Sequence, residues 1–144
     1  MGITVLHRPR PDAVEACLAH GLRPVLNSLE QVGWVRAVAH QRQKRLGVVL
    51  QLDTGMSRFG LSADDVRQIA SDPTVLDGLD VELVMSHLAC ADEPANPANA
   101  EQAARLVAYA GWLPVRAPLS LAASSGVFLG PDYHFDLVRP GAAL

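Results

Sequence analysis

Lysine and cysteine are the scarcest of the reactive residues in this chain of 144 residues. Lys44 is the single lysine among twelve basic residues, and the other eleven are arginines. The two cysteines, Cys17 and Cys90, lie far apart and form no CxxC pair. This pattern excludes a disulfide framework and a cysteine-based metal site, and it is typical of a reducing cytoplasm, where we expect the protein.

Long apolar runs and clustered positive charge are also missing. No stretch approaches the ~20 apolar residues of a membrane span, and residues 1–10 do not have the layout of a signal peptide. The formal net charge of −3 gives no electrostatic signature of nucleic-acid or anionic-membrane binding. We therefore expect neither a nucleic acid nor a membrane as a partner.

What the chain does contain is a regular alternation of short apolar runs and helical patterns. Strands are predicted at residues 3–6, 24–26, 48–52, 81–86, 118–122 and 137–139. Helices are predicted at 11–20, about 29–45, about 62–70 and 99–111. Strands that are apolar on both faces and separated by helices indicate a parallel α/β sheet. Six strands fit either a doubly wound sheet or part of a (β/α)8 barrel, since a complete barrel needs roughly 200 residues.

Polar side chains follow the predicted strands at the point where each strand ends. The apolar run 46–52 stops abruptly at Asp53-Thr54-Gly55, with an arginine and a second glycine after it. The carboxyl ends of parallel strands meet at one edge of a sheet, where α/β proteins bind their ligands. The groups expected at this edge are Asn27, Ser28, Asp53, Thr54, Arg58, Ser86, His87, Ser124, Ser125, Gly126, Arg139 and Gly141. Two arginines, a histidine, hydroxyls and glycine amides favour an anion-binding site.

Each of these residues also has a plainer interpretation. Asp53 before Thr-Gly can simply shape a turn, and Arg58 can be a solvated residue at a helix start. His87 can be a hydrogen-bonded core histidine, and Arg139 an ordinary residue at a strand end. Ser124-Ser125-Gly126 can cap a helix or form a phosphate cup of hydroxyls and amides.

Several motifs in order resemble the alanine racemase family. Residues 51–60, QLDTGMSRFG, are similar to the family signature K-x-D-T-G-M-x-R-x-G, and residues 86–93, SHLACADE, are similar to T-H-F-A-x-A-D-E. Further matches are PVLNS at 24–28, AASSG at 122–126 and HFDLVRPGAAL at 134–144. These motifs stand in the family's order and spacing and cover nearly the whole chain, which makes chance similarity improbable.

The resemblance implies a fold and an activity. Family members are homodimeric enzymes that use pyridoxal 5′-phosphate (PLP) to interconvert L-alanine and D-alanine, an amino acid needed for peptidoglycan. Each has an N-terminal (β/α)8 TIM barrel and a C-terminal β domain. We expect residues 1–144 to form a partial PLP-binding (β/α) barrel domain, corresponding to about strands 3–8, with the first two barrel strands and the C-terminal β domain absent.

The resemblance also implies roles for individual residues in binding PLP. Arg139 matches the arginine that donates to the pyridine nitrogen, and His87 matches the histidine beside the cofactor ring that contacts this arginine. Ser124 and the backbone amides of Gly141 and Ala142 match the phosphate cup. We expect supporting catalytic roles for His87 and Arg139.

Arg58 matches the arginine near the phenolic oxygen of the cofactor and the substrate carboxylate, and it is our candidate substrate-binding and supporting catalytic residue. Gln51 departs from the family pattern, because many members carry a carbamylated lysine there that orients this arginine. Glutamine cannot be carbamylated. We expect an anion such as chloride to take the place of the carbamate.

The two acid/base residues of the family have no match in this sequence. Nothing resembles the lysine motif that attaches the cofactor, Lys44 lies in a polar stretch before a strand, and Tyr109 and Tyr133 lack the context of the catalytic tyrosine. We expect PLP not to be covalently attached to this chain, and the chain alone to be inactive. Two alternatives remain open: a racemase for serine or a basic amino acid, and a non-catalytic barrel fragment that binds phosphate or PLP.

Overall fold

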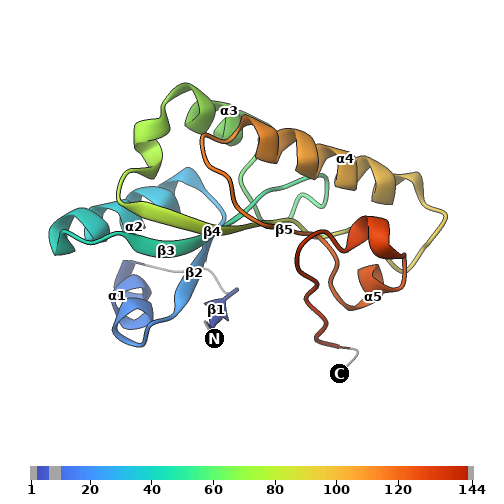
Figure 1. Ribbon diagram of the computed structural model, residues 1–144, viewed down its shortest axis with the longest axis horizontal. Helices are drawn as coiled ribbons and strands as arrows, with labels where there is room; N and C mark the ends of the chain where they lie inside the picture. The colour runs from blue at the N-terminus through green and yellow to red at the C-terminus, as the bar shows by residue number, and fades with distance from the viewer. Residues whose placement is uncertain (1–2, 7–10, 143–144) are drawn as a thin grey trace.

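The computed structural model describes residues 3–6 and 11–142 and contains a five-stranded sheet. The strands are β1 (Thr4–Val5), β2 (Arg23–Leu26), β3 (Leu46–Gln51), β4 (Leu79–Met85) and β5 (Leu119–Ser120). They are ordered 1-2-3-4-5 as in the sequence, and every neighbouring pair is parallel. The predicted parallel α/β sheet is therefore confirmed (Figure 1).

Helices connect the strands. They are α1 (Pro11–Ala19), α2 (Leu29–Arg42), α3 (Ala63–Ser71), α4 (Pro97–Trp112) and the short α5 (Ser124–Val127), with 3-10 turns η1 (Pro73–Leu76) and η2 (Pro131–Tyr133). Helices α3 and α4 lie side by side along one side of the sheet (Figure 1). Within the described ranges, none of these helices has the length and apolar character needed to cross a lipid bilayer.

Two helix starts follow from their capping residues. The Ser28 hydroxyl accepts a hydrogen bond from the Gln31 amide at 3.3 Å, and the Gln31 side chain in turn accepts one from the Asn27 amide. Ser62 and Asp65 form a complete reciprocal capping box at the start of α3. Helix α2 ends at Arg42 rather than near residue 45, because Gln43 adopts a left-handed conformation with φ of 50°.

Side-chain alternation along β3 divides the apolar residues between the two faces of the sheet. Val48, Leu50 and Leu52 belong to the main core, which the helices cover on one face. Val49 points the opposite way and forms a smaller buried cluster with Val25 and Met85. Because Gln51 is two residues after Val49, it lies on the face of this smaller cluster.

Residues 137–139 do not form the predicted sixth strand, although they lie where the next parallel strand would pair. The pairing in this part of the chain is limited to one isolated parallel bridge between Ala123 and Arg139, in which the Arg139 amide donates to the Ala122 carbonyl at 2.9 Å. Pro140 follows immediately and has no amide hydrogen to extend the ladder. The segment therefore continues the parallel order for one step and then turns into the loop that holds Gly141.

Candidate functional site

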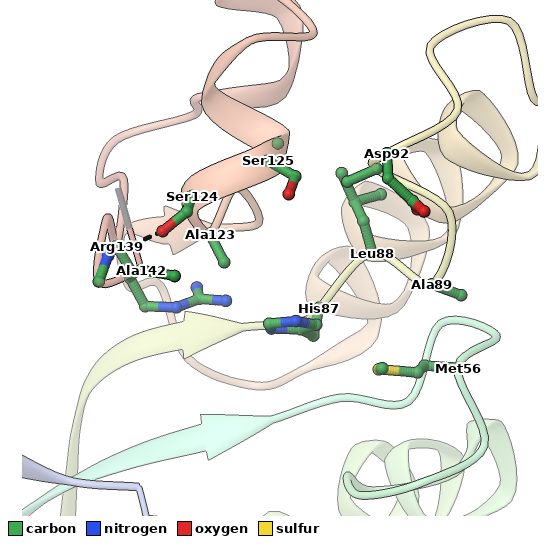
Figure 2. Close-up of a pocket in the computed structure, with 13 residues that line it drawn as sticks. Met56, His87, Leu88, Ala89, Asp92, Ala123, Ser124, Ser125, Arg139 and Ala142 are labelled. Carbon is green, nitrogen blue, oxygen red and sulfur yellow. Dashed lines mark hydrogen bonds between the residues drawn. The ribbon is translucent and has the colours of Figure 1, made fainter. Parts of the chain in front are cut away.

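A cavity of about 540 Å³ opens at the carboxyl ends of the central strands. It is lined from three directions: by the loop after β3, by the loop after β4, and by the start of α5 together with the C-terminal segment (Figure 2). The lining residues are Met56, His87, Leu88, Ala89, Ala91, Asp92, Ala123, Ser124, Ser125, Gly126, Arg139, Gly141 and Ala142. The structure thus brings together every residue predicted to hold the cofactor.

Arg139 joins the ends of two neighbouring strands. Its guanidinium donates to the Ser120 hydroxyl at 2.5 Å, the Ser86 carbonyl at 2.6 Å and the Leu121 carbonyl at 3.3 Å. Burial lowers the pKa of Arg139 to about 10, so the group remains cationic at neutral pH. A fixed positive charge therefore stands at the wall of the cavity.

His87 is the first residue after the buried Ser86 and is partly exposed to the cavity. Figure 2 shows the side chain of Arg139 extending toward the imidazole ring of His87. Burial lowers the pKa of His87 below its ordinary value of 6.5, and the positive charges of Arg139 and Arg58 lower it further. The ring is therefore neutral at pH 7 and can serve as a hydrogen-bonding or stacking surface beside a cation.

Ser124 and Gly141 lie next to each other at the wall of the cavity. The Gly141 amide donates to the Ser124 hydroxyl at 2.9 Å, which brings the C-terminal segment against the first residue of α5 (Figure 2). The N-cap position of α5 belongs to Ala123, and no side chain caps this helix, so Ser124 is not a helix cap. A hydroxyl held in place by a backbone amide, in a cavity that also contains a half-buried cation, suits an oxyanion such as a phosphate group.

The loop after β3 is held closed by backbone bonds. The Asp53 amide donates to the Leu61 carbonyl at 2.9 Å, and the Leu61 amide donates to the Gln51 carbonyl at 2.8 Å. Inside the loop, the Asp53 carboxylate accepts from the amides of Gly55 and Ser57 at 2.9 and 3.0 Å. The turn-shaping interpretation of Asp53 is therefore confirmed.

Arg58 lies on this closed loop and is exposed. It does not line the cavity, although its charge acts on His87 and its guanidinium lies 5.7 Å from the centre of the Phe59 ring. Gln51 donates to the Phe59 carbonyl at 3.4 Å, which ties the strand end to the backbone next to Arg58. Arg58 thus lies outside the cavity, on the loop that contributes Met56 to its wall.

Sequence reasoning missed several residues of the site. Met56 lines the cavity. Gln102 of α4 does not line it but donates hydrogen bonds to Thr54 in the loop after β3 and to His87 in the loop after β4. A signal for Gln102 was available: Asn99, Gln102 and Arg105 are polar residues spaced by three on a helix whose other inward positions are apolar. Such a stripe indicates buried hydrogen bonding rather than solvent exposure.

The lowered pKa of His87 should make the free energy of unfolding depend on pH. The folded chain binds its proton at a lower pH than the unfolded chain does, so the unfolded state holds more protons in the window just below 6.5. Stability is therefore expected to fall as the pH is lowered through this window. Urea unfolding at a series of pH values, compared between the wild type and His87→Gln, measures the effect.

His20→Gln is the matched control, because it removes an exposed histidine that does not line the cavity. It should keep the pH dependence of the wild type, whereas His87→Gln should flatten it. Identical pH profiles for the wild type and His87→Gln would show that His87 titrates alike in the folded and unfolded chains.

A parallel sheet with connecting helices, and a cationic cavity at the carboxyl ends of its strands, define an α/β protein of the (β/α)-barrel type. The family model described as "Alanine racemase, N-terminal domain" matches residues 1–144. The chain therefore belongs to the alanine racemase family, as the motifs predicted.

Relatives in this family are similar over nearly the whole chain. The catabolic alanine racemase of Mesorhizobium japonicum is 49% identical over 142 residues, which is 99% of this chain and 37% of that protein. The alanine racemase of Brucella ovis is 48% identical over 140 residues, which is 97% of this chain and 35% of that protein. The chain thus spans little more than a third of the length of these relatives.

The fold agrees with a solved member of the family. The crystal structure of alanine racemase from Bartonella henselae, with covalently bound pyridoxal phosphate, has a TM-score of 0.92 and 31% identity. The match covers 99% of this chain and 41% of that one. The five strands and their helices therefore form part of an alanine racemase barrel, and the expected partial barrel is confirmed.

Proposed function

We propose that this chain forms the cofactor-binding and substrate-orienting part of an alanine racemase, which interconverts L-alanine and D-alanine with PLP. The observation that carries the proposal is the convergence of Ser124, Gly141, His87 and Arg139 on one cavity. Such a cavity offers a hydroxyl and backbone amides for an oxyanion and, separately, a fixed cation. PLP carries a phosphate and a ring nitrogen at separate positions of one flat ring, which fits this combination of groups.

Each residue of the cavity would have a separate task. Ser124 and the amides of Gly141 and Ala142 would hold the phosphate, and Arg139 would face the ring nitrogen. Because Arg139 stays charged at neutral pH, it would keep that nitrogen from accepting a proton. His87 would lie against the ring and remain neutral beside the arginine.

PLP, when bound, withdraws electrons from the α-carbon of an amino acid and so makes its α-proton acidic. Arg58, on the rim of the site, would bind the carboxylate of the amino acid and so orient the α-carbon. The described part of the chain places no lysine at this end of the sheet, since Lys44 precedes β3. Tyr109 lies in α4 and stacks on Trp112 with 4.9 Å between the ring centres.

We infer that the two groups that exchange the α-proton belong to other parts of a longer protein, and that the active form is a homodimer with a further β domain. The position of Lys44 and the fraction of each relative that the chain spans support this. The 144-residue chain supplied with PLP and L-alanine should then form D-alanine far more slowly than a complete enzyme. A coupled D-amino-acid oxidase assay measures the D-alanine formed. A turnover equal to that of a complete enzyme would overturn this inference.

Binding of PLP to the chain tests the proposal directly. Equilibrium dialysis should show saturable binding that inorganic phosphate competes away, and pyridoxal without its phosphate should bind at least about tenfold more weakly. Ser124→Ala should weaken PLP binding by about tenfold, because it removes one hydrogen-bonding group from the phosphate cup.

Ser71→Ala is the control for this test, because Ser71 is exposed at the end of α3 and bonds only locally to the Gln68 carbonyl. It should bind PLP as the wild type does. Equal PLP affinity of the wild type and Ser124→Ala, or binding of pyridoxal as tight as that of PLP, would contradict the proposed phosphate cup.

The location of Lys44 also favours a second candidate function, a non-catalytic domain that binds PLP or another phosphate-bearing ligand. The two candidates differ once the segments missing from this chain are supplied. A longer protein with those segments that binds PLP and yet racemises no amino acid in a substrate panel would support the second. Racemisation of alanine, serine or a basic amino acid would identify the enzyme and its substrate.

A further inference from the structure

Gln102 is a buried residue of α4 whose side chain contacts the loops behind the cavity. It is 2% exposed. Its amide nitrogen donates to the His87 carbonyl at 3.0 Å and to the Thr54 hydroxyl at 3.3 Å, and its amide oxygen accepts from the Ala89 amide at 2.8 Å. Both donors and the acceptor are therefore used, and turning the amide over would place two acceptors together at the His87 carbonyl and two donors together at the Ala89 amide.

This carboxamide takes the place of a residue of a neighbouring strand. In a parallel ladder, one residue donates through its amide to the carbonyl of residue i and accepts through its carbonyl from the amide of residue i+2. Gln102 makes this pair of bonds with residues 87 and 89, just beyond the end of β4. Gln102 therefore supplies to the loop with His87 the two hydrogen bonds that a neighbouring strand would supply, beyond the point where the pairing of β4 ends.

The second donor of Gln102 extends the contact to the loop after β3. The Ser86 hydroxyl donates to the Leu52 carbonyl at 2.8 Å, so in its 2.7 Å contact with Thr54 the Ser86 oxygen accepts and Thr54 donates. The Thr54 oxygen is then free to accept from Gln102. The chain of donors runs from Gln102 through Thr54 and Ser86 to Leu52, and every hydroxyl in it is satisfied.

Two further residues on the same face of α4 continue this pattern. Arg105 donates to the Thr54 carbonyl at 3.0 Å, and Asn99 donates to the carbonyls of Cys90 and Glu93 at 3.2 and 3.0 Å. Only Gln102 contacts both loops among these three residues. It is therefore the residue of α4 that joins the loop with Arg58 to the loop with His87, in addition to the direct contact between Thr54 and Ser86.

We propose that Gln102 is a positioning residue that fixes the backbone of His87 against the loop after β3 and so holds the imidazole ring in the cavity. The importance of Gln102 for catalysis rests on the proposed PLP site, whereas its positioning of His87 rests only on the hydrogen bonds described above. The ring of His87 projects from the backbone atoms that Gln102 clamps. Losing the clamp should free this loop without breaking the sheet, because the backbone bonds of β3 to β4 do not involve α4.

Amide hydrogen exchange tests the clamp at one atom. In the wild type the Ala89 amide should be protected, and in Gln102→Met, which keeps the length of the side chain and removes its polar atoms, protection should fall by about tenfold or more. The Leu52 amide, bonded to the Met85 carbonyl at 2.8 Å, is the internal reference and should lose much less. Gln68→Met, which changes an exposed glutamine of α3, is the matched control.

An NMR titration of His87 is the second readout. In the wild type its pKa should lie below 6.5, and in Gln102→Met it should move back toward 6.5, because the ring leaves its place near Arg139 and Arg58 and becomes better hydrated. Gln102→Asn keeps the amide but is shorter by one methylene, so it should resemble Gln102→Met. This comparison separates the reach of the side chain from its polarity.

The outcomes distinguish this proposal from the proposed function. A freely exchanging Ala89 amide in the wild type would overturn it whatever the variants do, including variants that fail to fold. Equal loss of protection at Ala89 and Leu52 in Gln102→Met, with an unchanged His87 titration, would also overturn it. If the clamp is shown by exchange and titration while the wild type binds no PLP, the positioning role stands and the proposed function fails.

Discussion

Replacing Gly60 with alanine should lower the free energy of unfolding by about 3 kcal/mol. Gly60 has φ of 123°, a region that residues with a side chain rarely adopt. A Cβ atom there would lie 2.5 Å from the Asp53 nitrogen and 2.7 Å from the Leu52 carbonyl carbon. These are backbone atoms at the end of β3, so the clash cannot be relieved by turning a side chain. The closed loop would have to open, and Arg58 would move with it.

Urea unfolding followed by circular dichroism measures this loss, and Gly33→Ala is its control. Gly33 lies in α2, and a Cβ added there would meet nothing within 4 Å. Its replacement should raise stability by about 0.5–1 kcal/mol, since alanine is the better helix former. If both alanine variants unfolded at the same urea concentration, the described conformation of Gly60 would be wrong.

Replacing Arg139 with methionine should be the second most damaging change, with a loss of about 2–4 kcal/mol. The guanidinium donates to the Ser120 hydroxyl and the Ser86 carbonyl, which belong to buried residues at the ends of β5 and β4. Methionine fills similar space without a donor and leaves acceptors without this partner. The same change removes a positive charge that lowers the pKa of His87, so that pKa should rise.

Arg139→Lys separates the two effects of this substitution. Lysine keeps the charge, so the pKa of His87 should stay low, but it lacks the planar fork that reaches several acceptors at once. Stability should therefore still fall, by less than in the methionine variant. Urea unfolding and an NMR titration of His87 give the two quantities, and a methionine variant with unchanged stability and an unchanged titration would contradict the described contacts.

The strands and helices could be predicted largely because the sheet is buried on both faces. Runs such as residues 48–52 are apolar throughout, and capping residues such as Ser62 mark where helices begin. Helix α2 ended early because Gln43 adopts a left-handed conformation without a glycine to signal it. The strand predicted at residues 137–139 is not formed, because a single bridge and Pro140 limit the pairing of this segment.

The site could be predicted only where the end of a strand places a residue. His87 comes two residues after the end of β4, and Arg139 forms the single bridge that continues the parallel order, so this order was enough to bring them to one edge. Gln102 comes from the middle of a helix, and its contact with His87 depends on how α4 lies against the loops. Residue roles carried over from the family remain predictions, as does the anion expected beside Gln51 and Arg58.

Related genes should rarely differ in length between residues 53 and 60. The two backbone bonds of Leu61, to residues 53 and 51, fix how many residues the loop can hold, and Gly60 leaves no space for a bulge at its end. An inserted codon would shift Arg58 relative to the sheet or break one of these bonds. The exposed tip at Pro94 and Ala95 is closed only by a local turn, in which the Asn96 amide donates to the Glu93 carbonyl, so insertions and deletions should accumulate there during evolution.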